Sequence, residues 1–181
     1  MCTPGLDGEP LGRILKKAKE DYGMITSIDT AWNDAGSMNT VRPGLPYLDF
    51  FISSIAEARL VTGKEDLREL ADVLLDHGVR VVVVKMGPGG CYIKTRQDGG
   101  YEVRIPAWDV PVVDTTGAGD SFVAGFLTGV MKGWDLERAG RFGNTVGATA
   151  VGVLGAVEGV RSFEETLELM QVLMRDGRER E

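Results

Sequence analysis

The sequence has few of the residues that build metal-rich, disulfide-bonded or nucleic-acid-binding proteins. Its 181 residues include two cysteines and one histidine, so neither a disulfide framework nor a cysteine–histidine zinc site is expected. No block of lysine and arginine occurs and the formal net charge is −7, which argues against a nucleic-acid partner. Two thiols without a disulfide framework fit a reducing compartment, and we expect a cytoplasmic protein.

Long apolar segments are also scarce. The first ten residues contain no apolar core of a signal peptide. The longest uncharged stretch, Phe142–Val157, contains an asparagine and several glycines, and it is shorter than the roughly 18 residues that a membrane helix needs. We therefore expect no membrane partner. With 43% hydrophobic and 26% charged residues, the chain is predicted to fold as a single globular domain over residues 1–181.

Glycine, in contrast, is abundant. The chain has 25 glycines in 181 residues, near twice the average share of about 7%. They fall between regular elements instead of forming one linker. Because glycine lets a backbone approach other groups closely, this placement suggests loops that contact a ligand.

Hydrophobic periodicity predicts strands that alternate with helices. The four valines at 81–84 suit a strand covered on both faces, as in a parallel sheet. We expect an α/β fold with a mostly parallel sheet, with ligands at the carboxyl ends of its strands, in the loops after Lys85 and Val113. The predicted strands are 24–28, 49–52, 79–85, 91–95, 101–105 and 110–113. Helices are predicted at 10–21, 54–60 and 65–77, from about Ala118, after Asp135 and after Ser162, with a loop at 32–46 and a frayed end after Asp176.

The strongest candidate site is Gly117-Ala118-Gly119-Asp120, between a predicted strand and a hydrophobic helix. If the helix begins near Ala118, its free N–H groups and its dipole can hold a phosphoryl group. Asp120, in the first turn, could accept a proton from a hydroxyl that attacks phosphorus. From spacing alone, an aspartate with a purely structural role after a tight turn is an equally good interpretation.

The run DTTGAGDSFVAGF, Asp114–Phe126, resembles the C-terminal signature of the PfkB (ribokinase-like) carbohydrate kinases. The order of the elements from about Leu6 to Leu169 resembles this family as well. The resemblance implies a three-layer ribokinase-like α/β fold and ATP-dependent phosphorylation of a sugar hydroxymethyl group. Asp120 would be the catalytic base, and Gly117, Ala118 and Gly119 the anion hole. A non-catalytic nucleotide-binding fragment, and a kinase for a nucleoside or a hydroxymethylpyrimidine, remain as alternatives.

The same resemblance assigns nucleotide contacts to two further places. Asn144 lies where the family has an asparagine on the adenine side, and its position on the predicted helix turns it away from the apolar stripe. An exposed asparagine without a role is the other interpretation. The family's strand-to-loop nucleotide segment corresponds to Lys85, Met86, Gly87, Pro88, Gly89 and Gly90, which could also form an ordinary turn before a hairpin.

Two positions resemble cation sites of the family. Ser54-Ile55-Ala56-Glu57 resembles the NxxE motif, in which the glutamate organises the water shell of Mg²⁺ and the first residue contacts nucleotide phosphate or water. Here Ser54 replaces the asparagine, and Glu57 could also be a solvated helix glutamate. Asp114 and Thr116 match positions that bind a monovalent cation, K⁺, in some members, with the loop from Gly152 to Gly159 closing that site.

The signature lies late in the longer chains of this family. The resemblance therefore implies a partial ribokinase-like domain that lacks the N-terminal strands, the β-strand lid and most sugar-contacting residues. Missing strands would expose a sheet edge, which other chains can pair with. We expect a homo-oligomer, or another pairing through that edge, with ATP and a small sugar as ligands.

Overall fold

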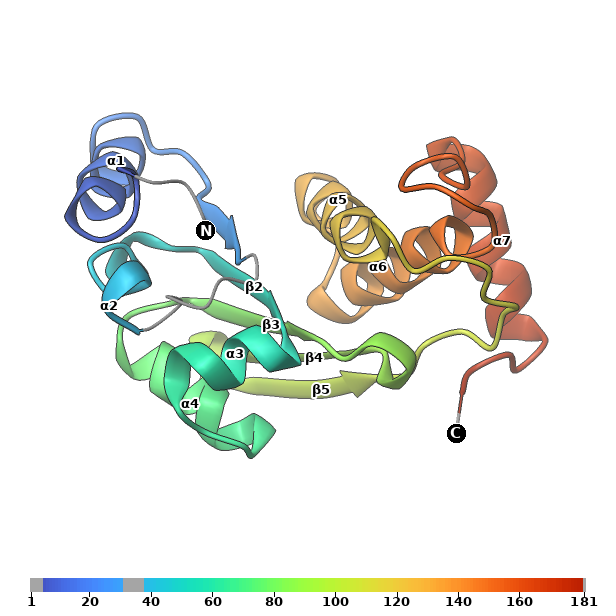
Figure 1. Cartoon of the computed structure of the whole chain (residues 1–181), viewed down its shortest axis with the longest axis horizontal. Coiled ribbons are helices and arrows are strands. Elements are labelled where there is room, and N and C mark those ends of the chain that lie inside the picture. The colour runs from blue at the N-terminus through green and yellow to red at the C-terminus, as the bar shows by residue number, and fades with distance from the viewer. Residues whose placement is uncertain (1–4, 31–37, 181) are drawn as a thin grey trace. The chain divides into compact units, whose positions relative to one another are not determined.

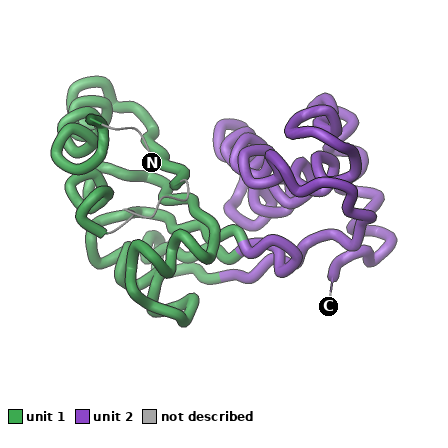
Figure 2. Tube along the Cα trace, in the orientation of Figure 1, with its two compact units in different colours: residues 1–85, 92–102 green, residues 86–91, 103–181 purple. Residues whose placement is uncertain are grey.

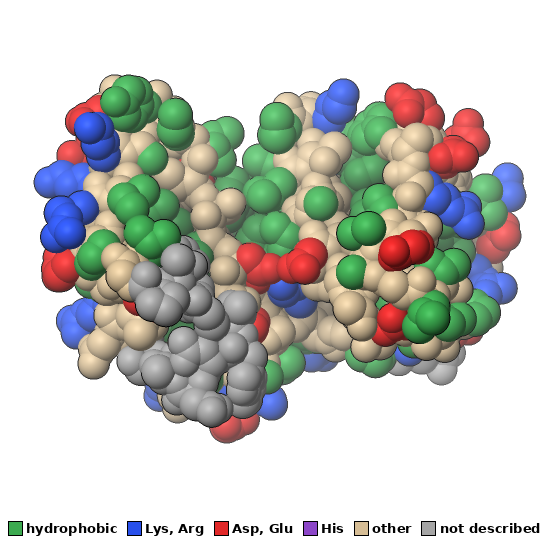
Figure 3. Space-filling model, turned by 45° about the horizontal axis from the view of Figure 1, so that its top comes forward, with side chains coloured by type: hydrophobic (Ala, Val, Ile, Leu, Met, Phe, Trp, Pro, Cys, Tyr) green, Lys and Arg blue, Asp and Glu red, His purple; other side chains and the backbone are tan. Residues whose placement is uncertain are grey.

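The computed structural model describes residues 5–30 and 38–180 (Figure 1). The chain divides into two compact units (Figure 2). Unit 1 comprises residues 1–85 and 92–102, and unit 2 comprises residues 86–91 and 103–181. Acidic and basic side chains are interspersed over the face shown in Figure 3.

A five-stranded sheet contains the strands in the order β1-β2-β3-β4-β5. The first three strands are parallel, with Ile28 opposite Phe51 and Phe51 opposite Val82. All four valines of β3 are buried, as their uninterrupted run predicted. The mostly parallel α/β arrangement is thus confirmed, with β4 and β5 joined by a tight turn in which Asp98 has φ 52°. The bounds are β1 Ser27–Asp29, β2 Phe50–Ser54, β3 Val81–Lys85, β4 Cys91–Thr95 and β5 Tyr101–Ile105.

The described residues of unit 1 form four α-helices: α1 Glu9–Glu20, α2 Met38–Val41, α3 Ile55–Thr62 and α4 Leu67–Asp76. Asp66 caps α4 at its start and His77 ends it. The predicted loop at 32–46 was wrong in part, because α2 and a 3₁₀ turn at Leu45–Tyr47 lie within it; residues 31–37 are outside the described residues.

The first predicted strand was too long at its beginning. Residues 24 to 26 are not in β1, and the side chains of Met24 and Ile25 are 54% and 65% exposed. Asp49 determines where Thr26 lies, because its carboxylate accepts hydrogen bonds from the Thr26 N–H at 2.9 Å and the Thr26 hydroxyl at 3.2 Å. The chain joins the sheet only after this contact.

Three helices form unit 2: α5 Ala118–Met131, α6 Leu136–Ala150 and α7 Phe163–Arg175. Asp135 and Ser162 cap α6 and α7, as predicted. A Cβ at Gly125 would lie 2.6 Å from Val146, and one at Gly129 would lie 2.9 Å from Ala139. Part of the glycine excess therefore serves close packing of α5 on α6, and not the ligand contact that the sequence suggested.

Two predictions for unit 2 were wrong. The segment from Val110 to Val113 forms no strand: Val113 is 62% exposed, and its N–H donates to the Val151 carbonyl at 2.8 Å, outside any strand ladder. The described residues after Asp176, up to Arg180, are held by hydrogen bonds and are not frayed. Arg180 N–H donates to the Ala107 carbonyl at 2.8 Å, and Asp109 N–H donates to the Arg178 carbonyl at 2.7 Å.

Candidate functional site

The start of α5 carries the strongest candidate residues. Gly117 is the N-cap with φ 72°, and no side chain caps the helix. A Cβ on Gly117 would overlap the carbonyl oxygen of Ala156, so only glycine fits both this backbone and this neighbour. Asp120 lies exposed in the first turn. The helix starts at Ala118, as predicted, and its N-terminus is accessible.

The amides of this turn are not equivalent. Ala118 N–H donates to the Thr115 carbonyl at 3.2 Å, which leaves it less able to bind a ligand. Within the described part of the chain, no acceptor takes the N–H groups of Gly119 and Asp120. These two donors, at the positive end of the helix dipole, can bind an anion. Of the three residues predicted to form the anion hole, Ala118 has an internal acceptor for its amide and Gly119 has none among the described residues; the anion-binding role stays a prediction.

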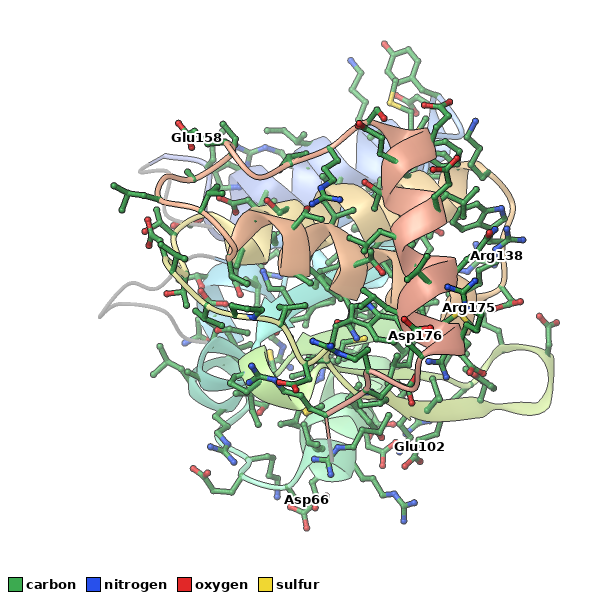
Figure 4. All side chains as sticks on the ribbon, turned by 90° about the vertical axis from the view of Figure 1, so that its right-hand side faces the viewer. Asp66, Glu102, Arg138, Glu158, Arg175 and Asp176 are labelled. Carbon is green, nitrogen blue, oxygen red and sulfur yellow. The ribbon has the colours of Figure 1, made fainter. Side chains whose placement is uncertain are left out.

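Asp114 links this turn to the loop after α6. One carboxylate oxygen accepts hydrogen bonds from the Thr116 N–H at 3.0 Å and the Thr116 hydroxyl at 2.8 Å, and the other accepts from the Gly155 N–H at 3.0 Å. The backbone N–H groups of Thr116 and Gly155 hold the pKa of Asp114 below its ordinary value. The residue is therefore an ionised carboxylate between two loops. Glu158, labelled in Figure 4, lies in the second of them.

Ser54 and Glu57 form a reciprocal cap at the start of α3. The Glu57 carboxylate accepts from the Ser54 N–H at 2.8 Å and from the Ser54 hydroxyl at 2.7 Å, and the Glu57 N–H donates to that hydroxyl at 3.3 Å. Ser54 is the last residue of β2 and the N-cap of α3, and the serine-to-glutamate spacing is that of a capping box. Its hydroxyl, assigned to nucleotide phosphate or water by resemblance, is engaged by Glu57.

Lys85 is paired at the end of β3. Its ammonium donates to both carboxylate oxygens of Asp29, at 2.8 Å each, and the two side chains are only 14% and 25% exposed. This ion pair was not predicted from the sequence. The signal was present, because Asp29 and Lys85 end strands that both flank β2 in a parallel arrangement.

Gly90 and Asn144 meet the same backbone segment. A Cβ on Gly90 would overlap Ile105, and the Asn144 amide donates to the carbonyls of Ile105 at 3.3 Å and Pro106 at 2.9 Å. Asn144 is 9% exposed, so the alternative interpretation of an exposed asparagine was wrong. Buried residues surround α6 on most sides, and a single apolar stripe could not reveal this.

The structure thus groups the candidates within each unit. Unit 2 holds the turn 114–120 beside the loop 151–159, and Asn144 beside Gly90. Gly87–Gly89 form a short 3₁₀ turn there with Met86 as its N-cap, and a Cβ at Gly87 would meet nothing within 4 Å. Unit 1 holds Ser54, Glu57 and Lys85.

Nowhere in residues 5–30 and 38–180 do three or more acidic, histidine or cysteine side chains gather in the manner of a protein-only metal site. None of the helices in these ranges combines the length and the apolar character that a bilayer-spanning helix requires.

Comparisons with known proteins agree with the signature. The profile described as "pfkB family carbohydrate kinase" matches residues 4–162. An uncharacterized sugar kinase of Archaeoglobus fulgidus is 39% identical over 88% of this chain and 61% of its own length. The 2-dehydro-3-deoxygluconokinase of Bacillus subtilis is 34% identical over 74% of this chain and 41% of its own length.

A solved E. coli structure that contains ATP and Mg²⁺ superposes with a TM-score of 0.76 at 25% identity, over 90% of this chain and 53% of that one. The chain spans about half the length of the relatives it matches. The signature, the mostly parallel sheet and these similarities agree, and the chain belongs to the pfkB family of carbohydrate kinases.

Proposed function

We propose that this chain carries the nucleotide and catalytic-base portion of a kinase that transfers phosphate from ATP to a sugar hydroxymethyl group. The observation that carries the proposal is the start of α5, where Asp120 is exposed beside amides that no described group accepts from. A helix N-terminus of this kind stabilises an anion, and here a carboxylate lies in the same turn.

In this proposal, the amides of Gly119 and Asp120 hold the transferred phosphoryl group, with Gly117 fixing the turn. The Asp120 carboxylate accepts the hydroxymethyl proton as the sugar oxygen attacks the γ-phosphorus. One oxygen–phosphorus bond forms, the bond from phosphorus to the β,γ-bridging oxygen breaks, and ADP leaves. Positioning and charge stabilisation supply most of the catalysis in such transfers.

The remaining assignments come from the family resemblance and are part of the proposal. Lys85–Gly90, Ser54 and Asn144 contact the nucleotide. Glu57 organises the water shell of Mg²⁺, which neutralises phosphate charge when bound. A single indirect carboxylate suits Mg²⁺, because this ion keeps several waters. Asp114 and Thr116, tied to the Gly155 loop, are the candidate K⁺ site, and their ionised carboxylate fits a hard cation.

We further propose that the outer strand β1 pairs with another chain, as a homo-oligomer or with a different partner. This strand ends the described sheet on one side, and Met24 and Ile25 are exposed just before it. Unpaired edges of this kind favour association between chains.

The experiment compares ATP binding by calorimetry and phosphate transfer to a panel of sugars, for the wild-type chain and Asp120→Asn. We expect turnover to fall by about 10²- to 10⁴-fold, as for loss of a general base, while ATP affinity stays unchanged. Asp135→Asn is the matched control, because asparagine also caps helices well. Full turnover in Asp120→Asn would contradict the assignment of the base.

The second candidate is a nucleotide-binding fragment without turnover. One observation favours it, namely that the chain spans about half the length of its relatives. It predicts ATP binding in the same calorimetry with no transfer to any sugar, nucleoside or hydroxymethylpyrimidine by the wild-type chain.

A further inference from the structure

The two carboxylate oxygens of Glu57 have unequal surroundings. Oε2 accepts three hydrogen bonds, from the Ser54 N–H at 2.8 Å, the Ser54 hydroxyl at 2.7 Å and the Thr30 hydroxyl at 3.2 Å. No donor among the described residues reaches Oε1. One oxygen is thus fixed by the protein, and the other keeps its capacity to accept hydrogen bonds from water.

Thr30 reaches Glu57 from a different part of the sheet. It directly follows β1, and its N–H donates to the Ile52 carbonyl at 3.3 Å, which extends the β1–β2 pairing by one residue. The residue is 7% exposed. Its neighbour Asp29 is held by Lys85. The hydroxyl of Thr30 is therefore placed by the sheet and not by a surface loop.

The hydrogen bond from Thr30 to Glu57 is relevant to the replacement of the asparagine of the NxxE motif by Ser54. Ser54 replaces the asparagine of that motif, and its hydroxyl closes the cap with Glu57 in this structure. Thr30 adds a second element, because a cap formed by one helix alone fixes the carboxylate relative to that helix only. With Thr30, the carboxylate is also fixed relative to the carboxyl ends of the parallel strands.

We propose that Thr30 is a positioning residue which, with Ser54, holds Oε2 of Glu57 so that Oε1 is presented to the water shell of a nucleotide-bound divalent cation. The inference rests on the proposed function. The donors present fit such a cation, because Oε1 is a hard oxygen and magnesium-type ions bind through water to few carboxylates. Residues that orient a metal-binding group in this way are worth about 10- to 100-fold in metal affinity.

The test is an electron paramagnetic resonance titration of the full chain with Mn²⁺, with and without a non-hydrolysable ATP analogue. Thr30→Val keeps the side-chain shape but removes the hydroxyl. We expect Mn²⁺ affinity in the presence of the analogue to fall about tenfold, while metal-free binding of the analogue is unchanged. Thr30→Ser, which keeps a hydroxyl, restores the affinity.

The matched control is Thr62→Val on the same helix. The Thr62 hydroxyl donates to the Ala58 carbonyl at 2.7 Å, at the opposite end of α3 from Glu57. Its removal leaves Mn²⁺ affinity at the wild-type value. A fall as large as that of Thr30→Val would overturn the proposal, because the effect would then be a general one on α3.

Two other outcomes separate this inference from the function on which it rests. If the analogue binds and Thr30→Val, folded by circular dichroism, takes up Mn²⁺ like the wild type, Thr30 does not position Glu57 and the proposed function stands. If the wild-type chain does not bind the analogue at all, the proposed function fails, and the inference fails with it. Paramagnetic broadening of the Glu57 carboxyl carbon by Mn²⁺ in the wild-type chain is a measurement that needs no variant, and its absence overturns the inference.

Discussion

Helices α5 and α7 lie in the same unit and have 14 and 13 residues, but they begin in opposite ways. In α7, Ser162 and Glu165 satisfy each other's backbone: the Glu165 N–H donates to the Ser162 hydroxyl at 3.3 Å, and the Ser162 N–H donates to the Glu165 carboxylate at 3.0 Å. In α5, Gly117 offers no side chain.

The difference separates stability from binding. The first amides of any helix lack partners inside it, and a cap supplies them at a gain of about 1 kcal/mol. Helix α7 has this stabilising cap. Helix α5 has no side-chain cap, so its first amides remain available to an anionic ligand, which agrees with the anion-binding role proposed for this turn.

Among the variants that test this difference between the two helix starts, Gly117→Ala is expected to change stability and ATP binding the most. The left-handed backbone costs an alanine about 1–2 kcal/mol, and overlap with the Ala156 carbonyl adds about 1–3 kcal/mol. We expect a loss of about 2–5 kcal/mol in the free energy of unfolding, measured by urea denaturation, together with loss of ATP binding.

Gly133→Ala is the matched control for that variant. Gly133 has the same φ of 72°, but a Cβ there would meet nothing within 4 Å. The Gly133→Ala variant should therefore lose only the about 1–2 kcal/mol of unfolding free energy that the left-handed backbone costs an alanine, and its ATP affinity should not change. If the two variants lost the same free energy of unfolding, the close approach of Ala156 to Gly117 would not contribute to the cost of Gly117→Ala.

Ser162→Ala tests the other side of the comparison. Removing the hydroxyl breaks the reciprocal cap of α7, so we expect the free energy of unfolding to fall by about 1 kcal/mol. Calorimetric ATP affinity should not change, and Ser162→Thr should recover most of the stability. If Ser162→Ala weakened ATP binding as Gly117→Ala does, the two helix starts would not be functionally distinct.

The smallest effect is expected from pH. Hydrogen bonds from the Ser162 hydroxyl, first, and from its N–H hold the pKa of Glu165 below its ordinary value. The unfolded chain protonates this carboxylate near pH 4.3, so its contribution is complete above that pH and is lost as the pH falls through the lower folded value. The melting temperatures of the wild type and Glu165→Gln should therefore converge as the pH falls through that lower folded pKa, and a difference independent of pH would contradict this.

Local patterns predicted the capped helices and the buried strands well. Ser162 and Asp135 mark helix starts by chemistry that acts within four residues, and the valines of β3 require burial on both faces. The start of α5 was equally readable, because a left-handed glycine before a hydrophobic helix is a local feature. These elements depend on near neighbours in the chain.

The errors arose where distant residues decide the outcome. Asn144 is buried because Ile105 and Pro106 pass over its helix, and Thr30 contacts Glu57 across 27 positions. Val110–Val113 has the composition of a strand but lacks a partner strand in the described structure. Neither helical periodicity nor β-propensity contains this information. The roles of the candidate residues in binding and catalysis stay predictions.

The return of the last described residues to the segment after β5 has a consequence for the order of folding. The Arg178 side chain donates to the Asp109 carbonyl across 69 positions, so this contact closes a loop that contains α5, α6 and α7. Contacts of such long range form late, because the loop entropy must first be offset by local structure. Unit 2 should therefore assemble its three-helix nucleus first and acquire this closing contact last.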